Sequence, residues 1–162
     1  MRTLVVGLGN PILGDDGVGW RVVQELQTRH ALNDGAEMDC LSLGGLRLME
    51  RMLGYERVIL VDALADESIP PGEVHVFPLE ALPNPSAGHT ASAHDVSLRT
   101  ALEMAQHLGW AVPSQIWVVG ISVTPHFDFS ERLSPNVEAA IPQAIKAVQD
   151  LLETFSARGG AK

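Results

Sequence analysis

The sequence has a single cysteine and few basic residues, and both shortages limit what the protein can be. Cys40 is the lone cysteine among 162 residues, so an internal disulfide is impossible. Lysine and arginine number 11 against 20 acidic residues, which gives a net charge of −9. A chain this acidic repels phosphate backbones and anionic lipid surfaces. We therefore expect neither a nucleic-acid partner nor a membrane partner.

Long apolar runs are also missing. No run approaches the roughly 18 residues of a membrane span, and the first one, residues 3–6, stops at a glycine too early for a secretory signal. With the lone cysteine, which suits a reducing compartment, this predicts a cytoplasmic protein. The hydrophobic fraction of 46% is enough for a core. We expect one domain over residues 1–157 and a flexible tail over 158–162.

Short apolar runs alternate with amphipathic segments along the chain. The runs predict strands near residues 4–8, 37–42, 58–61, 73–78 and 115–121, and the periodic segments predict helices near 17–31, 46–53, 95–108 and 134–155. This alternation predicts an α/β fold with three layers, in which helices flank a mostly parallel twisted sheet of about five strands. Residues 80–93 are rich in Pro, Ser, Ala and Gly, and we expect them to form a loop.

Three polar residues fall at the expected carboxyl edge of this sheet, where open parallel sheets form their sites. Asp16 follows the first strand, Asp62 ends the third, and His94 stands between the polar loop and a helix. Two carboxylates and an imidazole suit a divalent metal such as nickel, zinc or iron. Each residue also has a purely structural interpretation, for example Asp16 as a helix cap. Position alone leaves both interpretations open.

Five segments carry a more specific signal. In chain order they are GLGNPILGDDGVG (residues 7–19), SLGGL (42–46), VDA (61–63), SAHD (92–95) and LSPNVEAAIP (133–142). Their sequences and their order resemble the NiFe-hydrogenase maturation endopeptidases. That family removes a C-terminal extension from the precursor of the hydrogenase large subunit after nickel has been inserted. The resemblance spans nearly the whole chain and implies a phosphorylase/hydrolase-like α/β fold.

The resemblance also implies the roles of particular residues. It implies that Asp16, Asp62 and His94 are catalytic and metal-binding, and that Gly44 and Gly45 bind substrate backbone. It implies a nickel-dependent endopeptidase that acts on the large-subunit precursor. The two carboxylates would make it an aspartyl protease, and the protein would work as a monomer. The precursor would present the nickel itself, and another divalent metal could substitute. Whether the metal or a carboxylate activates water stays open, and the glycine pair fits a simple left-handed turn equally well.

The sequence departs from the family pattern at two places. The family often has an aspartate just before the glycine pair, whereas Ser42 and Leu43 stand there and Asp39 lies farther back. Residues 122–130 match no family segment, and we interpret His126 as a surface residue or a substrate contact. Cys40 lies in a predicted strand with no obvious base, so we interpret it as buried and not as a nucleophile.

Three alternatives compete with this interpretation. Residues 7–11 also resemble the start of peptidyl-tRNA hydrolases, but Asp15 and Asp16 follow where that family differs, and the net charge of −9 disfavours tRNA. A Rossmann cofactor domain needs a third glycine where Ile12 stands. The remaining alternative is a non-catalytic, nickel-recognising docking chaperone for the precursor, which a cleavage assay separates from a protease.

Overall fold

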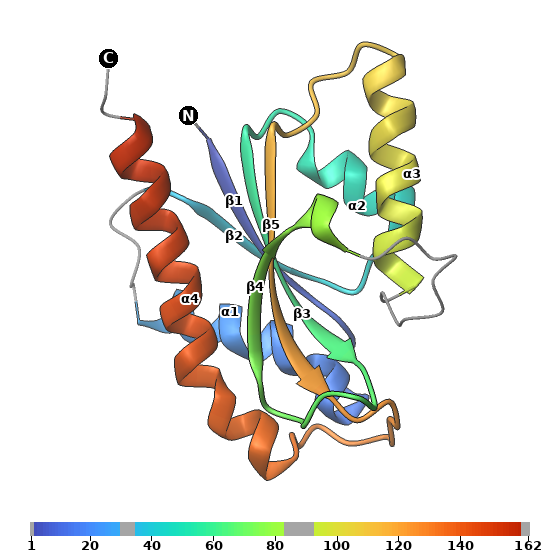
Figure 1. Ribbon diagram of the computed structural model, residues 1–162, viewed down its shortest axis with the longest axis vertical. Coiled ribbons are helices and arrows are strands. Elements are labelled where there is room, and N and C mark those ends of the chain that lie inside the picture. Colours follow the sequence, from blue (N-terminus) through green and yellow to red (C-terminus); the bar gives the residue numbers. More distant parts are fainter. Residues whose placement is uncertain (1, 30–34, 83–92, 160–162) are drawn as a thin grey trace.

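The computed structural model describes the backbone of residues 2–29, 35–82 and 93–159 (Figure 1). A short 3-10 helix, η2 (Leu79–Ala81), overlaps the start of the loop expected over 80–93, and residues 83–92 of that loop lie outside the described residues. Among the helices of the described part, none is both long and apolar enough to cross a membrane.

Five strands form one sheet. They are β1 (Thr3–Leu8), β2 (Glu37–Leu41), β3 (Arg57–Ala65), β4 (Val74–Pro78) and β5 (Gln115–Val123). Their order is β2-β1-β3-β5-β4, and all neighbours are parallel except β4, which pairs antiparallel with β5. The central strands are buried on both faces, which explains their continuous apolar runs. The prediction of an α/β fold with a mostly parallel five-stranded sheet is confirmed.

Helices cover both faces of the sheet. The helices are α1 (Val18–Thr28), α2 (Gly45–Met52), α3 (Ala93–His107) and α4 (Pro135–Gly159). Figure 1 shows α1 and α4 on one face and α2 and α3 on the other. Two apolar clusters fill the spaces between layers, so β3 sends Val61 and Ala63 toward α1 and α4, and Leu60 toward α2 and α3.

Glycines let α1 lie directly on the sheet. Gly19 is the second residue of α1, and a Cβ atom there would overlap the Val61 carbonyl oxygen and lie 2.6 Å from the Leu8 oxygen. A Cβ on Gly7 would lie 2.5 Å from the Gly19 oxygen. Backbone therefore packs on backbone here. This contact fixes the start of α1 against the carboxyl ends of β1 and β3.

The structure corrects three expected boundaries. Asp62 does not end its strand, because β3 continues to Ala65 in register with β5. Asp16 does not cap α1: it lies in a 3-10 turn, η1 (Gly14–Gly17), and Gly17 holds the N-cap position without a side-chain bond. The last helix is longer than expected, because α4 continues through Gly159 instead of ending near residue 155. Residues 160–162 lie outside the described part.

Candidate active site

Asp16 is positioned by a backbone reversal directly after β1. Gly9 has φ +122°, and a Cβ atom there would overlap the Asp16 carbonyl oxygen. The chain can therefore fold back on itself, and the Asn10 N–H donates to Asp16 Oδ2 at 2.7 Å. Asp16 is half-buried in η1, which contacts β3. The glycine-rich opening thus brings this carboxylate to the carboxyl edge of the two central strands.

Asp62 is a buried carboxylate on the neighbouring strand. It is 4% exposed, and its Oδ1 accepts the Ala63 N–H at 2.8 Å. Because Val61 and Ala63 face α1 and α4, Asp62 points to the face covered by α2 and α3. Carboxylates are seldom buried unless they are paired, hydrogen-bonded or needed for chemistry. Among the described side chains, Asp62 is therefore the strongest candidate for a catalytic group.

His94 approaches the same face of the sheet through its backbone. It is the second residue of α3, as the sequence predicts for a position at a helix start, but its side chain lies outside the described residues. Among the described side chains, no group of three or more His, Cys, Asp or Glu could hold a metal ion. Asp16 and Asp62 offer two hard oxygen donors, and His94 is the candidate for a third ligand. The metal set stays a prediction.

Asp15, unlike Asp16, has a structural role, because its carboxylate binds Ser134. Its carboxylate accepts two hydrogen bonds from Ser134, from the N–H at 2.7 Å and from the hydroxyl at 2.8 Å. The two residues are 119 positions apart in the sequence, and no local pattern signals their pairing. Asp15 thus ties the candidate site to the segment that leads into α4.

The glycine pair lies beside the candidate site. Gly44 is extended before α2, and Gly45 has φ +53°, which is the left-handed conformation of the alternative interpretation. Ser42 Oγ donates to the Gly9 oxygen at 2.7 Å, which places this turn next to the Asp16 segment. A contact of the pair with substrate stays a prediction. Asp39 accepts a bond from Arg51 Nε at 3.0 Å, so its carboxylate is already paired.

Cys40 is half-buried, and its Sγ lies 3.8 Å from the Trp20 carbonyl oxygen. Burial, and to a smaller extent the nearby Asp39 charge, raises the pKa of the Cys40 thiol to about 11.

Only about 0.1% of the Cys40 thiol would be ionised at pH 8, against some tens of per cent for an ordinary cysteine. We therefore expect iodoacetamide at pH 8 to label native Cys40 at least about 100-fold more slowly than the urea-unfolded chain. Intact mass against time measures this, and equal rates would contradict it.

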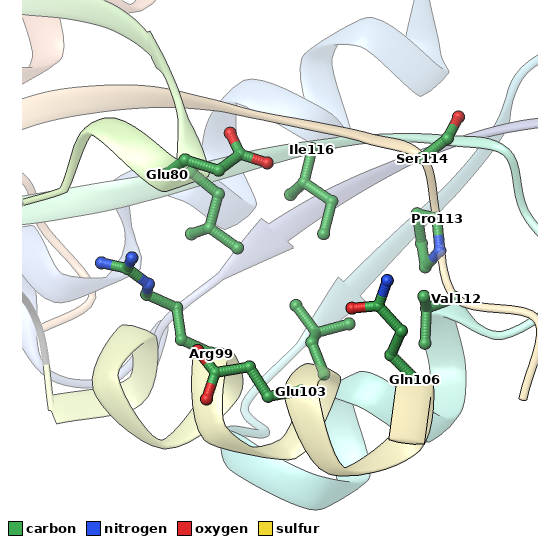
Figure 2. Close-up of a pocket in the computed structure, with 10 residues that line it drawn as sticks. Glu80, Arg99, Glu103, Gln106, Val112, Pro113, Ser114 and Ile116 are labelled. Atoms are coloured by element: carbon green, nitrogen blue, oxygen red, sulfur yellow. The ribbon is translucent and has the colours of Figure 1, made fainter. Parts of the chain in front are cut away.

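A pocket of about 460 Å³ lies away from these carboxylates (Figure 2). It is formed between α3 and the first residues of β5, and Ile116 is one of its apolar residues. Figure 2 shows Glu80, Arg99 and Glu103 around it, and neither Asp16 nor Asp62 lines it. This pocket therefore lies at one end of the sheet, and the two carboxylates lie at the other. We place the candidate active site by chemistry, because the buried carboxylate and the glycine-rich turns meet at the carboxyl edge.

Known proteins resemble the whole of this architecture. A family model described as hydrogenase maturation protease (HycI) matches residues 20–151, which include Asp62 and His94. The hydrogenase 2 maturation protease of Escherichia coli is 28% identical over 153 residues, 93% of this chain and 92% of that protein. The hydrogenase expression/formation protein HoxM of Cupriavidus necator is 29% identical over 94% of this chain and 74% of its own length.

Solved structures agree with this result. The hydrogenase maturating endopeptidase HybD from Escherichia coli superimposes with a TM-score of 0.78 at 28% identity, covering 96% of this chain and 94% of that one. The NiFe hydrogenase maturation protease HybD from Thermococcus kodakarensis gives a TM-score of 0.69 at 26% identity, over 94% and 99% of the two chains. Sequence, family model and fold thus coincide over nearly all of the chain, and the protein belongs to the hydrogenase maturation protease family.

Proposed function

We propose that this protein is an endopeptidase that removes the C-terminal extension from the large-subunit precursor of a NiFe hydrogenase after nickel insertion. The observation that carries the proposal is the buried Asp62 carboxylate, which lies beside the Asp16 turn at the carboxyl edge of the sheet in a member of this protease family.

In this proposal the nickel belongs to the substrate. Asp16, Asp62 and His94 would bind the nickel that the precursor presents, which holds the adjacent peptide bond at the sheet edge. Two carboxylates and one imidazole leave coordination positions open for the ligands that the precursor already supplies. A precursor without nickel would lack this anchor, so cleavage would report that the metal centre is complete.

The chain's own groups would then carry the hydrolysis. Asp62 is the group best placed to accept a proton from the attacking water, because its carboxylate is buried and fixed by the Ala63 N–H. The turn at Gly44 and Gly45 has no side chain to obstruct an extended substrate backbone. Such a site needs no nucleophilic cysteine, in agreement with the raised pKa of the half-buried Cys40 thiol.

Intact-mass spectrometry of the host's hydrogenase large-subunit precursors tests the proposal. Each precursor, with and without nickel, is incubated with the protein, and its intact mass is measured before and after the incubation. We expect loss of a C-terminal peptide from the nickel-loaded form alone. Binding without any loss of mass would overturn the protease assignment in favour of a docking chaperone. Equal cleavage of the nickel-free form would overturn the nickel requirement.

Two adjacent aspartates provide a matched pair of variants. We expect Asp16→Asn to slow cleavage about 100-fold or more and to weaken nickel-dependent precursor binding, because a neutral amide is a poor metal ligand. The fold should survive, since the amide oxygen can still accept the Asn10 N–H. Asp15→Asn weakens the charged bonds to Ser134 and should lower the free energy of unfolding by about 1–2 kcal/mol, with cleavage nearly unchanged. Similar cleavage by both variants would remove Asp16 from the site.

A further inference from the structure

Large apolar side chains are exposed on both sides of the candidate active site. Eight such residues occur in the described part of the chain: Ile12, Leu46, Val76, Met104, Leu108, Trp110, Phe127 and Phe129. Four of them, Ile12, Leu46, Phe127 and Phe129, follow the carboxyl ends of parallel strands. Phe129 is 87% exposed. Half of the set therefore gathers at the sheet edge that carries Asp16 and Asp62.

The phenylalanine segment is fixed to the backbone that carries Asp16. The Ser130 N–H donates to the Ile12 oxygen at 2.9 Å, and the Gly14 N–H donates to the Ser130 oxygen at 2.7 Å. These bonds form a parallel bridge between Leu13 and Ser130. Phe129 thus precedes a residue bonded to Ile12, and the bridge ends two residues before Asp16. Backbone hydrogen bonds therefore hold the segment with these apolar side chains next to the turn that carries Asp16.

Phe127, Phe129 and Ile12 are not part of the hydrophobic core. Phe127 is 37% exposed, Ile12 is 47% exposed, and neither they nor Phe129 belong to the two apolar clusters. Burial of apolar surface releases roughly 25 cal/mol per Å², and fixed aromatic side chains are the usual anchors of protein interfaces. Apolar side chains grouped beside an active site indicate a surface that a partner covers.

The charged residues around these apolar side chains indicate what kind of partner surface would be complementary. Residues 10–16 and 126–132 contain four carboxylates, Asp15, Asp16, Asp128 and Glu131, and one permanent cation, Arg132. Asp128 lies between the two phenylalanines, and its side chain is 80% exposed. A complementary surface would offer an apolar depression bordered by lysine or arginine. The whole chain, at −9, would favour the approach of the same kind of surface.

We infer that Ile12, Phe127 and Phe129 form a docking strip that binds an apolar, basic-bordered surface of the hydrogenase precursor beside the peptide bond to be cut. The inference rests on the proposed function, because it takes the precursor as the partner. The strip contributes affinity and the choice of hydrogenase, and it leaves the chemical step to the carboxylates. Its loss therefore raises KM and Kd and leaves kcat nearly unchanged.

The test compares two double variants. Phe127→Ser with Phe129→Ser removes the strip's aromatic side chains. Met104→Ser with Leu108→Ser removes side chains of 60% and 65% exposure at the end of α3, near the opposite edge of the sheet, and is the matched control. Cleavage of the nickel-loaded precursor gives KM and kcat, calorimetric titration gives Kd, and thermal unfolding verifies the fold.

We expect the phenylalanine variant to raise KM and Kd about 10- to 100-fold, with kcat within about twofold of wild type, and the control to change none of them. Equal KM and Kd for the phenylalanine variant and wild type would overturn the strip and leave the protease assignment intact. If wild type binds the precursor without cutting it, the protease assignment fails, and weaker binding by the phenylalanine variant still supports the strip. A wild-type protein that neither binds nor cuts any host precursor would overturn both.

Discussion

The Asp62→Asn variant should cleave the hydrogenase precursor about 10²- to 10⁴-fold more slowly than wild type while remaining folded. Asparagine has nearly the same shape as aspartate, and its amide oxygen can keep the bond from the Ala63 N–H. The amide can neither accept the proton of an attacking water nor bind nickel as a carboxylate does. The effect should therefore fall on kcat more than on stability.

Asp39→Asn is the matched control for this experiment. Asp39 is a carboxylate of β2, in the same sheet, and Asp39 pairs with Arg51 instead of lying at the candidate site. A half-exposed ion pair contributes less than about 1 kcal/mol, so this variant should cleave normally and unfold at nearly the wild-type temperature. Single-turnover cleavage and thermal unfolding measure both properties. Normal cleavage by Asp62→Asn would exclude Asp62 from the chemistry.

The second large effect is expected at Gly19. Alanine is normally the better helix former by about 1 kcal/mol. At this position its methyl group would overlap the Val61 oxygen and crowd the Leu8 oxygen, both backbone atoms of the sheet. The clash is relieved only if α1 moves away from β1 and β3. We expect Gly19→Ala to reduce the free energy of unfolding by about 3 kcal/mol or more, as measured in urea.

Gly109→Ala separates this packing effect from backbone strain. Gly109 has φ +75°, and a Cβ atom there would meet nothing within 4 Å. The substitution forces alanine into the left-handed region at a cost of about 1–2 kcal/mol, without any overlap. A loss at Gly19 no greater than the loss at Gly109 would contradict close packing of α1 on the sheet.

The fold could be predicted because its central strands are buried on both faces. Residues 4–8 and 58–61 are continuous apolar runs, and such runs are typical of strands covered by helices on both sides. The end of β3 could not be predicted in the same way. Asp62 interrupts the apolar run, so the pattern indicates a strand end, whereas pairing with β5 carries the strand on to Ala65. The acidic residue that misplaced the boundary is the one with a candidate chemical role.

The sequence could indicate which residues are candidates for the site, but it could not predict the hydrogen bonds that hold their segments together. The position of Asp16 after β1 follows from the glycine-rich opening, and the resemblance to a known family identifies Asp62 and His94. The bonds that hold the site together join distant positions, such as Asp15 with Ser134. Such pairings depend on how α4 packs against α1, and no local periodicity records that packing.

The pairing of Asp15 with Ser134, together with the bridge between Leu13 and Ser130, also has a consequence for the order of assembly. Asp16 is synthesised before the residues that brace its turn, which follow more than a hundred positions later in the sequence. A growing chain can form β1 and α1 but cannot yet complete the frame around Asp16. We therefore expect the turn that carries Asp16 to reach its final position only after residues 130–134 have been synthesised and have packed against it.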